Sequence, residues 1–494
     1  MAYTVASPNT GTTVSAQMQE RNLWKKGVDI FEQSSDFFMD MEGPSVNSLI
    51  TTITDTSKGK GQKIKVPVMA GLYDEPHMGE ELFESADDFE ELKFNEYELL
   101  VDYLRHGVSW TDRMEEFMGM RGEIVSGLPE EMGKWLGRAK TERLLMMFLH
   151  KLDAENLVYA NGKSQDTLVA ADVLDWDEVV SMGVQLQRLG GRPAEVGRAG
   201  RNMIRKGVVV ATTDALFSLE LDSAYKQVLR ETVNEANAKM IFDGGYSNVR
   251  GHVIRQYNPI DHDGVGAIGS PLNAKAVLGG AIAAGTAVFD VLGGGNAIAA
   301  AVTKKKFFKF FPGYAYRWLV NDVLSPGNTT RYLLVVNPPN APVDPNKIGM
   351  YAYTTGNDGN KITITQRLGS AASGARVTTL GDVVWNTGVW AGKHTEVHPI
   401  GATILPCNAK GQVFGDSLML YAGAALRGYG KYRNQRSVEE KEGGAEGTMA
   451  FIRRIFVTSV FGQTPRRDAQ LRCPGVLRLR HAVQYAGMPL PTVV

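Results

Sequence analysis

A strand, an acidic loop, a second strand and a long helix follow one another between residues 59 and 147, and this stretch decides the fold. Its four pieces are GKGQKIKVPVMAGL (59–72), MGEELFESADDFEEL (78–92), YELLVDYLRHGVSW (97–110) and MGKWLGRAKTERLL (132–145). In the first piece, Ile64, Val66 and Val68 alternate with other residues at the period of a half-buried strand. Pro67 has no backbone N–H to donate, so we expect this strand at the edge of a sheet.

The segment between the two strands is strongly acidic. From Asp74 to Glu98 the chain carries eleven acidic residues and one lysine, a local charge of −10. The return strand alternates at Tyr97, Leu99, Val101 and Tyr103. A hairpin this long, with so little apolar material at its tip, cannot bury a core of its own. We therefore expect it to need a partner surface.

A long helix is predicted after the return strand. Asp112 can act as its N-cap, and Glu115 three positions later completes a capping box. Apolar residues then recur mostly at spacings of three and four, which is typical of one buried helix face. Gly127 and Pro129 interrupt the pattern, so we predict a kinked or broken helix from 112 to about 152.

The rest of the chain predicts mixed structure with a β-rich part. Strands are predicted at Val208–Ala211, His252–Gln256, Tyr332–Val336, Ile348–Tyr353, Lys361–Thr365 and Asp382–Trp385. Helices are predicted at Thr213–Leu219, Ser223–Ala238 and the Gly/Ala-rich Ser417–Gly428. The first 45 residues hold only a short amphipathic patch, Trp24 to Phe38, and are expected to form an extended arm that lies on another surface.

The apolar segment Ala276–Val302 is long enough, at 27 residues, to cross a bilayer. Two features oppose a membrane span. Asp290 lies in the middle of the segment, and the triplet Gly293–Gly295 would break a helix. We expect instead a small-residue helix packed inside a soluble core.

Composition excludes several classes of protein. The 494 residues are 43% hydrophobic and 22% charged with a net charge of −1, which excludes wholesale disorder and a strongly basic nucleic-acid clamp. Cys407 and Cys473 are too few for a disulfide scaffold or a cysteine-rich metal protein. The N-terminus lacks the pattern of a signal peptide, so we expect a non-secreted protein.

The motifs that carry catalytic chemistry are weak. Gly264, Gly266 and Gly269 form one GxGxxG, but residues 258–263 separate it from the preceding strand, so it favours a structural loop. A nucleotide-cofactor-dependent oxidoreductase built on Gly264–Gly269 is kept as an alternative. His394 and His398 have ligand-like spacing in a strand or loop, where adventitious polar residues are the simpler interpretation. We expect no cofactor, no metal and no catalytic residues.

A second charged region lies near the C-terminus. From Arg427 to His481 there are twelve lysines and arginines and five acidic residues, a local charge of +7. One neutral chain thus carries an N-terminal arm and an acidic hairpin that cannot fold alone, together with an oppositely charged region. This combination is typical of a protein that assembles with copies of itself.

These pieces, in this order, resemble a tailed-phage major capsid protein with the Hong Kong-97-type fold, and more closely the N-four-type podophage capsid family. The resemblance is carried by the stretch from Gly59 to Met147, and by GATILPCNA (401–409), continuing to Arg427, and FVTSVFG (456–462). It covers about a third of the chain and lies in pattern more than in fixed motifs.

The resemblance implies an α+β, Hong Kong-97-like capsid fold with an N-arm, an E-loop, a peripheral domain with a long spine helix, an axial domain and a β-rich insertion. The implied segments are 1–45 for the N-terminal arm, 46–110 for the E-loop region, 111–204 for the peripheral domain with spine helix 112–152, 205–324 for part of the axial domain, 325–405 for the insertion, and 406–494 for the axial/peripheral return with the basic C-terminal region.

The resemblance also implies a function without catalysis. The chain would be a structural subunit that forms hexamers and pentamers enclosing double-stranded DNA, in a virion capsid assembled in the bacterial cytoplasm. Expected partners are other copies of itself, scaffold, portal and cement proteins, and DNA by weak non-specific contact, with no membrane. A prophage-derived encapsulating nanocompartment shares this fold and stays a further alternative.

Contacts between copies are expected to join the acidic hairpin to the basic region. The candidate residues are Asp87, Asp88, Glu90 and Glu91 on the acidic side and Arg453, Arg454, Arg466, Arg467 and Arg472 on the basic side. Lys63, Lys65 and Lys93 lie near the loop, but nothing in the sequence indicates a covalent cross-link between subunits.

Overall fold

The structure is a computed structural model. It describes residues 27–53, 63–72, 92–111, 121–150, 152–199, 202–232, 248–249, 252–257, 276–278, 288–292, 330–338, 340–344, 347–354, 361–368, 397–399, 402–408, 411–429, 435–441 and 452–483. Two compact units divide the chain. The first comprises Met1–Leu144 and Ala422–Cys473, and the second comprises Leu145–Tyr421 and Pro474–Val494.

The first unit is built on a seven-stranded sheet. Its strands are β1 (Glu42–Gly43), β2 (Ile50–Ile53), β3 (Lys63–Met69), β4 (Phe94–Thr111), β17 (Ala425–Tyr429), β18 (Gln435–Lys441) and β19 (Ile452–Pro465). The order is β1-β2-β17-β19-β4-β3, with β18 also paired to β19. The predicted hairpin is confirmed, because β3 pairs antiparallel with β4. The strand that contains Pro67 is at the end of the order, as the missing N–H donor predicted.

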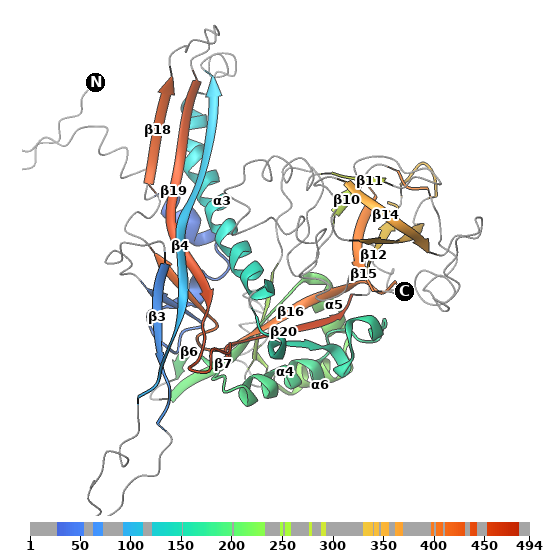
Figure 1. Cartoon of the computed structure of the whole chain (residues 1–494), viewed down its shortest axis with the longest axis horizontal. Helices are drawn as coiled ribbons and strands as arrows, with labels where there is room; N and C mark the ends of the chain where they lie inside the picture. Colours follow the sequence, from blue (N-terminus) through green and yellow to red (C-terminus); the bar gives the residue numbers. More distant parts are fainter. Residues whose placement is uncertain are drawn as a thin grey trace, which may run out of the picture. The chain divides into compact units, whose positions relative to one another are not determined.

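Helix α3 (Arg121–His150) runs along this sheet (Figure 1). Within the first unit, its Met132 and Leu136 pack with Leu104 of β4 and with Val457 and Phe461 of β19. The predicted long helix is therefore confirmed over these residues, while the proposed N-cap at 112 lies outside the described part of the chain.

The break predicted near Pro129 is wrong, because Pro129 lies inside one continuous helix. A proline removes one helical hydrogen bond. Burial of the helix face against the sheet offsets that loss, since most helical stability in proteins comes from such packing.

The second unit contains another seven-stranded sheet, with order β5-β20-β16-β7-β9-β8 and β6 paired to β7. Its strands are β5 (Leu157–Tyr159), β6 (Ala194–Ala199), β7 (Asn202–Ala211), β8 (Asn248–Val249), β9 (His252–Gln256), β16 (Phe414–Leu420) and β20 (Val476–Ala482). The helices are α4 (Trp176–Arg188), α5 (Thr213–Leu221) and α6 (Ser223–Thr232), and short 3-10 turns include η3 (Ala154–Asn156), η4 (Ala160–Gly162) and η5 (Gln165–Thr167). The strand and helix predictions at 208–219 and 252–256 are confirmed, as is the part of the helix predicted from Ser223 that the structure describes.

The predicted helix Ser417–Gly428 is wrong. These residues form β16 and β17, the first of which is a central strand of its sheet. Every residue of both strands is buried. A strand buried on both faces does not alternate between buried and exposed side chains, so periodicity could not distinguish it from a buried helix.

A closed six-stranded antiparallel sheet also belongs to the second unit. Its order is β10-β11-β14-β13-β12-β15, and the strands are β10 (Ala276–Leu278), β11 (Val288–Leu292), β12 (Thr330–Val336), β13 (Ile348–Thr354), β14 (Lys361–Leu368) and β15 (Thr403–Cys407). The three strands predicted between 332 and 365 are confirmed, while the strand predicted at Asp382–Trp385 lies outside the described residues.

The helix expected at Ala276–Val302 is wrong where the structure describes it, because β10 and β11 are strands of this closed sheet. The sheet thus includes strands that precede the predicted insertion at 325–405. Among the described residues, no helix combines the length and apolar character needed to cross a membrane.

Three buried charges lie inside the sheet of the second unit. The Asp416 carboxylate of β16 accepts hydrogen bonds from Arg478 Nη2 at 2.7 Å and from Arg480 Nε at 3.0 Å, both on β20. Burial alone would raise the pKa of Asp416, but the two guanidinium groups outweigh burial and lower it to about 2. The Asp416 carboxylate is therefore ionised and is held between the two arginines.

We expect Asp416→Asn to destabilise the second unit by about 3–5 kcal/mol, because it leaves two buried guanidinium groups without their carboxylate. Asp468→Asn is the control, because the Asp468–Arg472 pair is partly exposed and contributes only about 0–1 kcal/mol. Urea denaturation at pH 7 measures both. Equal effects of the two substitutions would contradict the prediction.

The lowered pKa of Asp416 determines how the stability of the second unit changes with pH. The folded pKa of Asp416 is about 2, below its value of roughly 3.9 in an unfolded chain. Its stabilising contribution is therefore complete above pH 4 and is lost as the pH falls through 2, and Asp416→Asn should remove this part of the acid dependence.

Candidate functional site

The candidate site is the place where the N-terminal segment docks on its own unit. A helix over residues 27–35 is followed by η1 (Met39–Met41) and β1. Two α3 glycines at i,i+4 spacing allow this helix to approach closely. A Cβ on Gly133 would lie 2.6 Å from Phe31 Cβ, and a Cβ on Gly137 would lie 2.6 Å from the carbonyl oxygen of Glu32. Only glycine permits both contacts.

Buried apolar side chains complete the docking. Val28 and Phe38 are fully buried, and Val28 packs into the core cluster that contains Met132 and Leu136. The N-terminal segment from residue 27 onwards is thus part of the core of this unit. The sequence prediction of an arm over 1–45 covers these packed residues, and residues 1–26 lie outside the described part.

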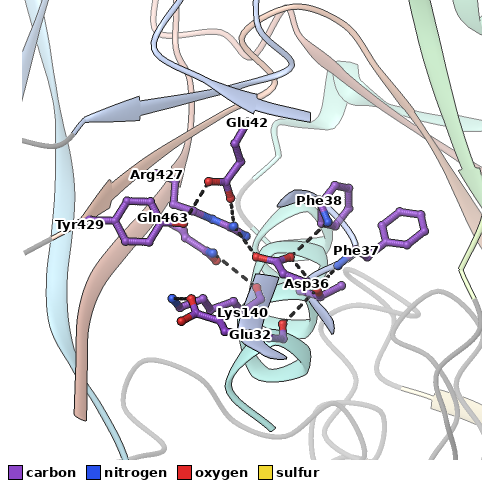
Figure 2. Close-up of polar contacts among 11 residues, drawn as sticks. Glu32, Asp36, Phe37, Phe38, Glu42, Lys140, Arg427, Tyr429 and Gln463 are labelled. Atoms are coloured by element: carbon purple, nitrogen blue, oxygen red, sulfur yellow. Dashed lines mark hydrogen bonds and ion pairs between the residues drawn. The ribbon is translucent and has the colours of Figure 1, made fainter. Parts of the chain in front are cut away.

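The same segment makes polar contacts with α3 (Figure 2). Lys140 and Glu32 form an ion pair in which both side chains are buried. Thr141 Oγ1 donates to Asp36 Oδ1 at 2.9 Å and accepts from the Phe37 backbone N–H at 3.1 Å. The Asp36 carboxylate and the Phe37 backbone N–H therefore both have a partner on α3.

Arg427 of β17 joins the segment to the sheet. Its Nη1 donates to Asp36 Oδ2 at 2.6 Å and also to Glu42 Oε1, while the Tyr429 hydroxyl donates to Glu42 Oε2 at 3.0 Å. The Arg427 side chain is 0% exposed. Within the described residues, its Nε and Nη2 and the neighbouring Gln463 Oε1 are buried without a hydrogen-bond partner. A buried charge of this kind is costly to leave unpaired.

Aromatic rings line the second cation of the site. Lys140 Nζ lies 5.1 Å from the Tyr429 ring centroid and 5.2 Å from that of Phe461, within the range of cation–π attraction. We refer to Glu32, Asp36, Glu42, Lys140 and Arg427 as the clasp. It holds three carboxylates of the N-terminal segment against two cations of the body of the unit, which is an arrangement for anchoring and not for turnover.

Two other α3-associated groups have shifted pKa values. Burial raises the pKa of Glu142 to about 7, against a smaller opposing effect of Arg138. Burial also lowers the pKa of His106, whose ring stacks on Trp135 with centroids 4.3 Å apart. Among the described residues, neither forms a hydrogen bond or ion pair with a second titratable group, so we assign both to packing.

The residues predicted from sequence are only partly described. Asp87, Asp88, Glu90 and Glu91 lie outside the described residues. Arg453 and Arg454 are near the start of β19, where the register places Glu440 and Glu439 of β18 opposite them. Arg466, Arg467 and Arg472 follow the end of the same strand. The five arginines are therefore divided between the two ends of β19.

The three later arginines contact their own chain. Arg466 Nη1 donates to the Val46 carbonyl at 3.4 Å, Arg467 donates to the Leu471 carbonyl, and Arg472 Nε lies 3.3 Å from Asp468 Oδ2. Lys65 of the hairpin pairs with Glu96 across β3 and β4.

The histidine and glycine motifs do not form a described site. His398 is fully buried in the second unit, where Nδ1 lies 2.6 Å from Asn337 Oδ1 and Nε2 lies 2.7 Å from the Tyr351 hydroxyl. His394 and the GxGxxG at 264–269 lie outside the described residues. The described residues contain no group of three potential metal ligands, and both cysteines are free and buried.

Sequence reasoning missed the clasp. Its members come from three distant segments, and no local motif connects Arg427 with Asp36. One signal was available, since Gly133 and Gly137 interrupt an otherwise bulky helix at the i,i+4 spacing that marks a close-packing face.

We expect Gly137→Ala to cost about 1–3 kcal/mol, because the added Cβ overlaps backbone atoms of the docked segment. Gly127→Ala on the same helix is the matched control. A Cβ at position 127 meets no atom within 4 Å, so helix propensity should make that change neutral or stabilising by up to about 1 kcal/mol. Thermal unfolding measures the difference, and two equal shifts in Tm would show that the close approach at Gly137 is not needed for docking of the N-terminal segment.

We expect Arg427→Leu to cost about 3–5 kcal/mol, because Asp36 and Glu42 lose their buried cation. The segment around residues 36–43 should also become accessible to protease. Arg466→Leu is the control, since its described hydrogen bond to Val46 is long and at the surface. The proposed role of the clasp is wrong if the N-terminal segment of the Arg427 variant resists proteolysis as the wild type does.

Comparison with known proteins identifies the fold. No protein-family model and no curated protein sequence matches the chain. Among solved structures, the capsid of Ralstonia phage GP4 aligns over 93% of this chain and 93% of that chain, with a TM-score of 0.50 and 14% sequence identity.

Two further structures align less well. The capsid asymmetric unit of cyanophage Pam1 covers 91% of this chain and 93% of its own, with a TM-score of 0.49 and 10% identity. The head structure of Helicobacter pylori bacteriophage KHP40 covers 91% of each chain, with a TM-score of 0.47 and 9% identity. The two sheets, the long helix and the closed sheet therefore make up an α+β chain with the fold of a phage capsid protein.

Proposed function

We propose that this chain is the structural subunit of a bacteriophage capsid and has no catalytic role. The observation that carries the proposal is the alignment with the Ralstonia phage GP4 capsid, because it includes 93% of each chain. At 14% identity the alignment supports a shared fold, and the assembly itself is our inference.

In this proposal the shell forms from hexamers and pentamers and encloses double-stranded DNA. Residues 1–45 correspond to the N-arm, 46–110 to the E-loop region and α3 to the spine helix, with the axial domain and the insertion in the later segments. Partners are further copies of this chain, with scaffold, portal and cement proteins, inside a bacterial host. A near-neutral chain suits weak, non-specific contact with packaged DNA, since a strongly basic wall would hold phosphates tightly.

The described end of the β3–β4 hairpin supports assembly. Met69, Leu72, Leu92 and Phe94 are 55–65% exposed, and the register places Met69 opposite Phe94. A cluster of exposed large apolar side chains next to an acidic segment is unfavourable on an isolated subunit. Burial against a neighbouring copy would remove that cost.

Expression of the chain alone tests the proposal. Sedimentation and negative-stain microscopy should show capsomers or multi-megadalton shells. A small oligomer whose Tm rises with a nicotinamide or flavin nucleotide would contradict it and favour the oxidoreductase alternative. Shells that contain an enzyme in place of DNA, after purification from the natural host, would identify a nanocompartment instead.

Charge reversal tests the acidic segment. We expect Asp87, Asp88, Glu90 and Glu91 changed to lysine to abolish assembly at low salt, because the hairpin then repels the basic surface of its neighbour. Each exposed ion pair contributes only about 0.2–1 kcal/mol, so the four together set register while apolar burial holds the shell. Changing the same residues to Asn and Gln should have a smaller effect. Normal particles from the lysine variant would show that electrostatic docking is not required.

A further inference from the structure

The strands β6 and β7 form a ribbon that extends beyond its sheet. Only residues 207–211 of β7 pair with β9 or β16, whereas the first half of β7 pairs with β6 alone among the described strands. β6 has no described partner except β7. A two-stranded ribbon is only marginally stable by itself. This one therefore has, along β6, a backbone edge with no described strand beside it.

The ribbon and the six residues that precede it are strongly basic. Residues 188–206 contain one acidic residue and six lysines or arginines, a local charge of +5. The basic residues are Arg188, Arg192, Arg198, Arg201, Arg205 and Lys206. Arg188 and Arg192 are exposed, and the register places the single acidic residue, Glu195, opposite Arg205.

We propose that this ribbon is the surface that receives the acidic segment Asp74–Glu98 of a second copy of the chain. The inference rests on the proposed function, because it names the receiving surface of a contact between capsid subunits. Charge complementarity is its first support, with −10 on the segment and +5 on residues 188–206. Opposite charges at this density also steer association.

The arginines predicted from sequence are less suited to this role. Arg453 and Arg454 have glutamates opposite them in register, and Arg472 lies 3.3 Å from Asp468. A carboxylate already next to an arginine reduces the attraction for another one. Residues 188–206 carry six basic residues and one acidic residue, and in the described register only Arg205 of the ribbon lies opposite a glutamate.

The apolar content of the two segments favours a protein partner over phosphate. The ribbon carries Val196, Met203 and Ile204 between its basic residues. The acidic segment carries Leu82, Phe83, Phe89 and Leu92 between its carboxylates. A nucleic-acid backbone would match the cations and offer no apolar groups, whereas the acidic segment has both carboxylates and apolar side chains.

Binding of a probe tests the ribbon directly. A fluorescent peptide of residues 74–98 is titrated with the full-length chain, and anisotropy is measured at low salt. We expect Arg198→Glu with Arg205→Glu to weaken binding roughly tenfold or more, and Arg198→Lys with Arg205→Lys to preserve it. The control Arg466→Glu with Arg467→Glu should change binding much less. An equal or larger loss in that control, or unchanged binding in the ribbon variant, would overturn the proposal.

Assembly provides the second test. The Arg198→Glu, Arg205→Glu variant should stay as unassembled folded subunits, with an unchanged circular dichroism spectrum and Tm. Adding Asp87→Lys and Asp88→Lys should restore particles. Wild-type chains that never form particles would refute the proposed function, while particles from the wild type and from the glutamate variant alike would refute only this inference. Ribbon-dependent binding of a duplex DNA fragment, without peptide binding, would also overturn it.

Discussion

The buried Arg427 guanidinium is the interaction on which the first unit depends. It lies on a central strand and donates hydrogen bonds to two carboxylates of the N-terminal segment, those of Asp36 and Glu42. Desolvating an arginine is expensive, and the cost is recovered only when the carboxylates are in place. The docked N-terminal segment and the sheet are consequently stable together, and this coupling fixes where β1 and β2 join the sheet.

The same principle organises the second unit with different residues. Asp416 of β16 pairs with Arg478 and Arg480 of β20, in a sheet where every residue of both strands is buried. Buried ion pairs add little net stability compared with apolar packing, but they penalise alternative registers severely. Both units therefore place a buried ion pair on a strand inside the sheet.

Much of the first unit could be predicted from local sequence. Alternation at Ile64, Val66 and Val68 fixed the edge strand, and the spacing of Met132 and Leu136 fixed the buried face of α3. The prediction failed where periodicity carries no information. Ser417–Leu420 and Ala425–Gly428 are buried on both faces. β10 and β11 pair with each other, but their other partners in the closed sheet, β15 and β14, are more than 70 residues away. Propensity cannot decide such segments, because distant strands supply their hydrogen bonds.

The sequence by itself determined the hairpin, the long helix and the separation of acidic from basic segments, because strand alternation, helical spacing and charge are local properties of the chain. Only the tertiary structure decided which charges are buried and which stay at the surface. Arg427 and Arg466 look alike in the sequence, yet the first is enclosed by carboxylates from almost 400 residues away and the second donates one long hydrogen bond at the surface. The physical reason is that burial depends on which segments pack together, and the environment of a charge depends on that packing.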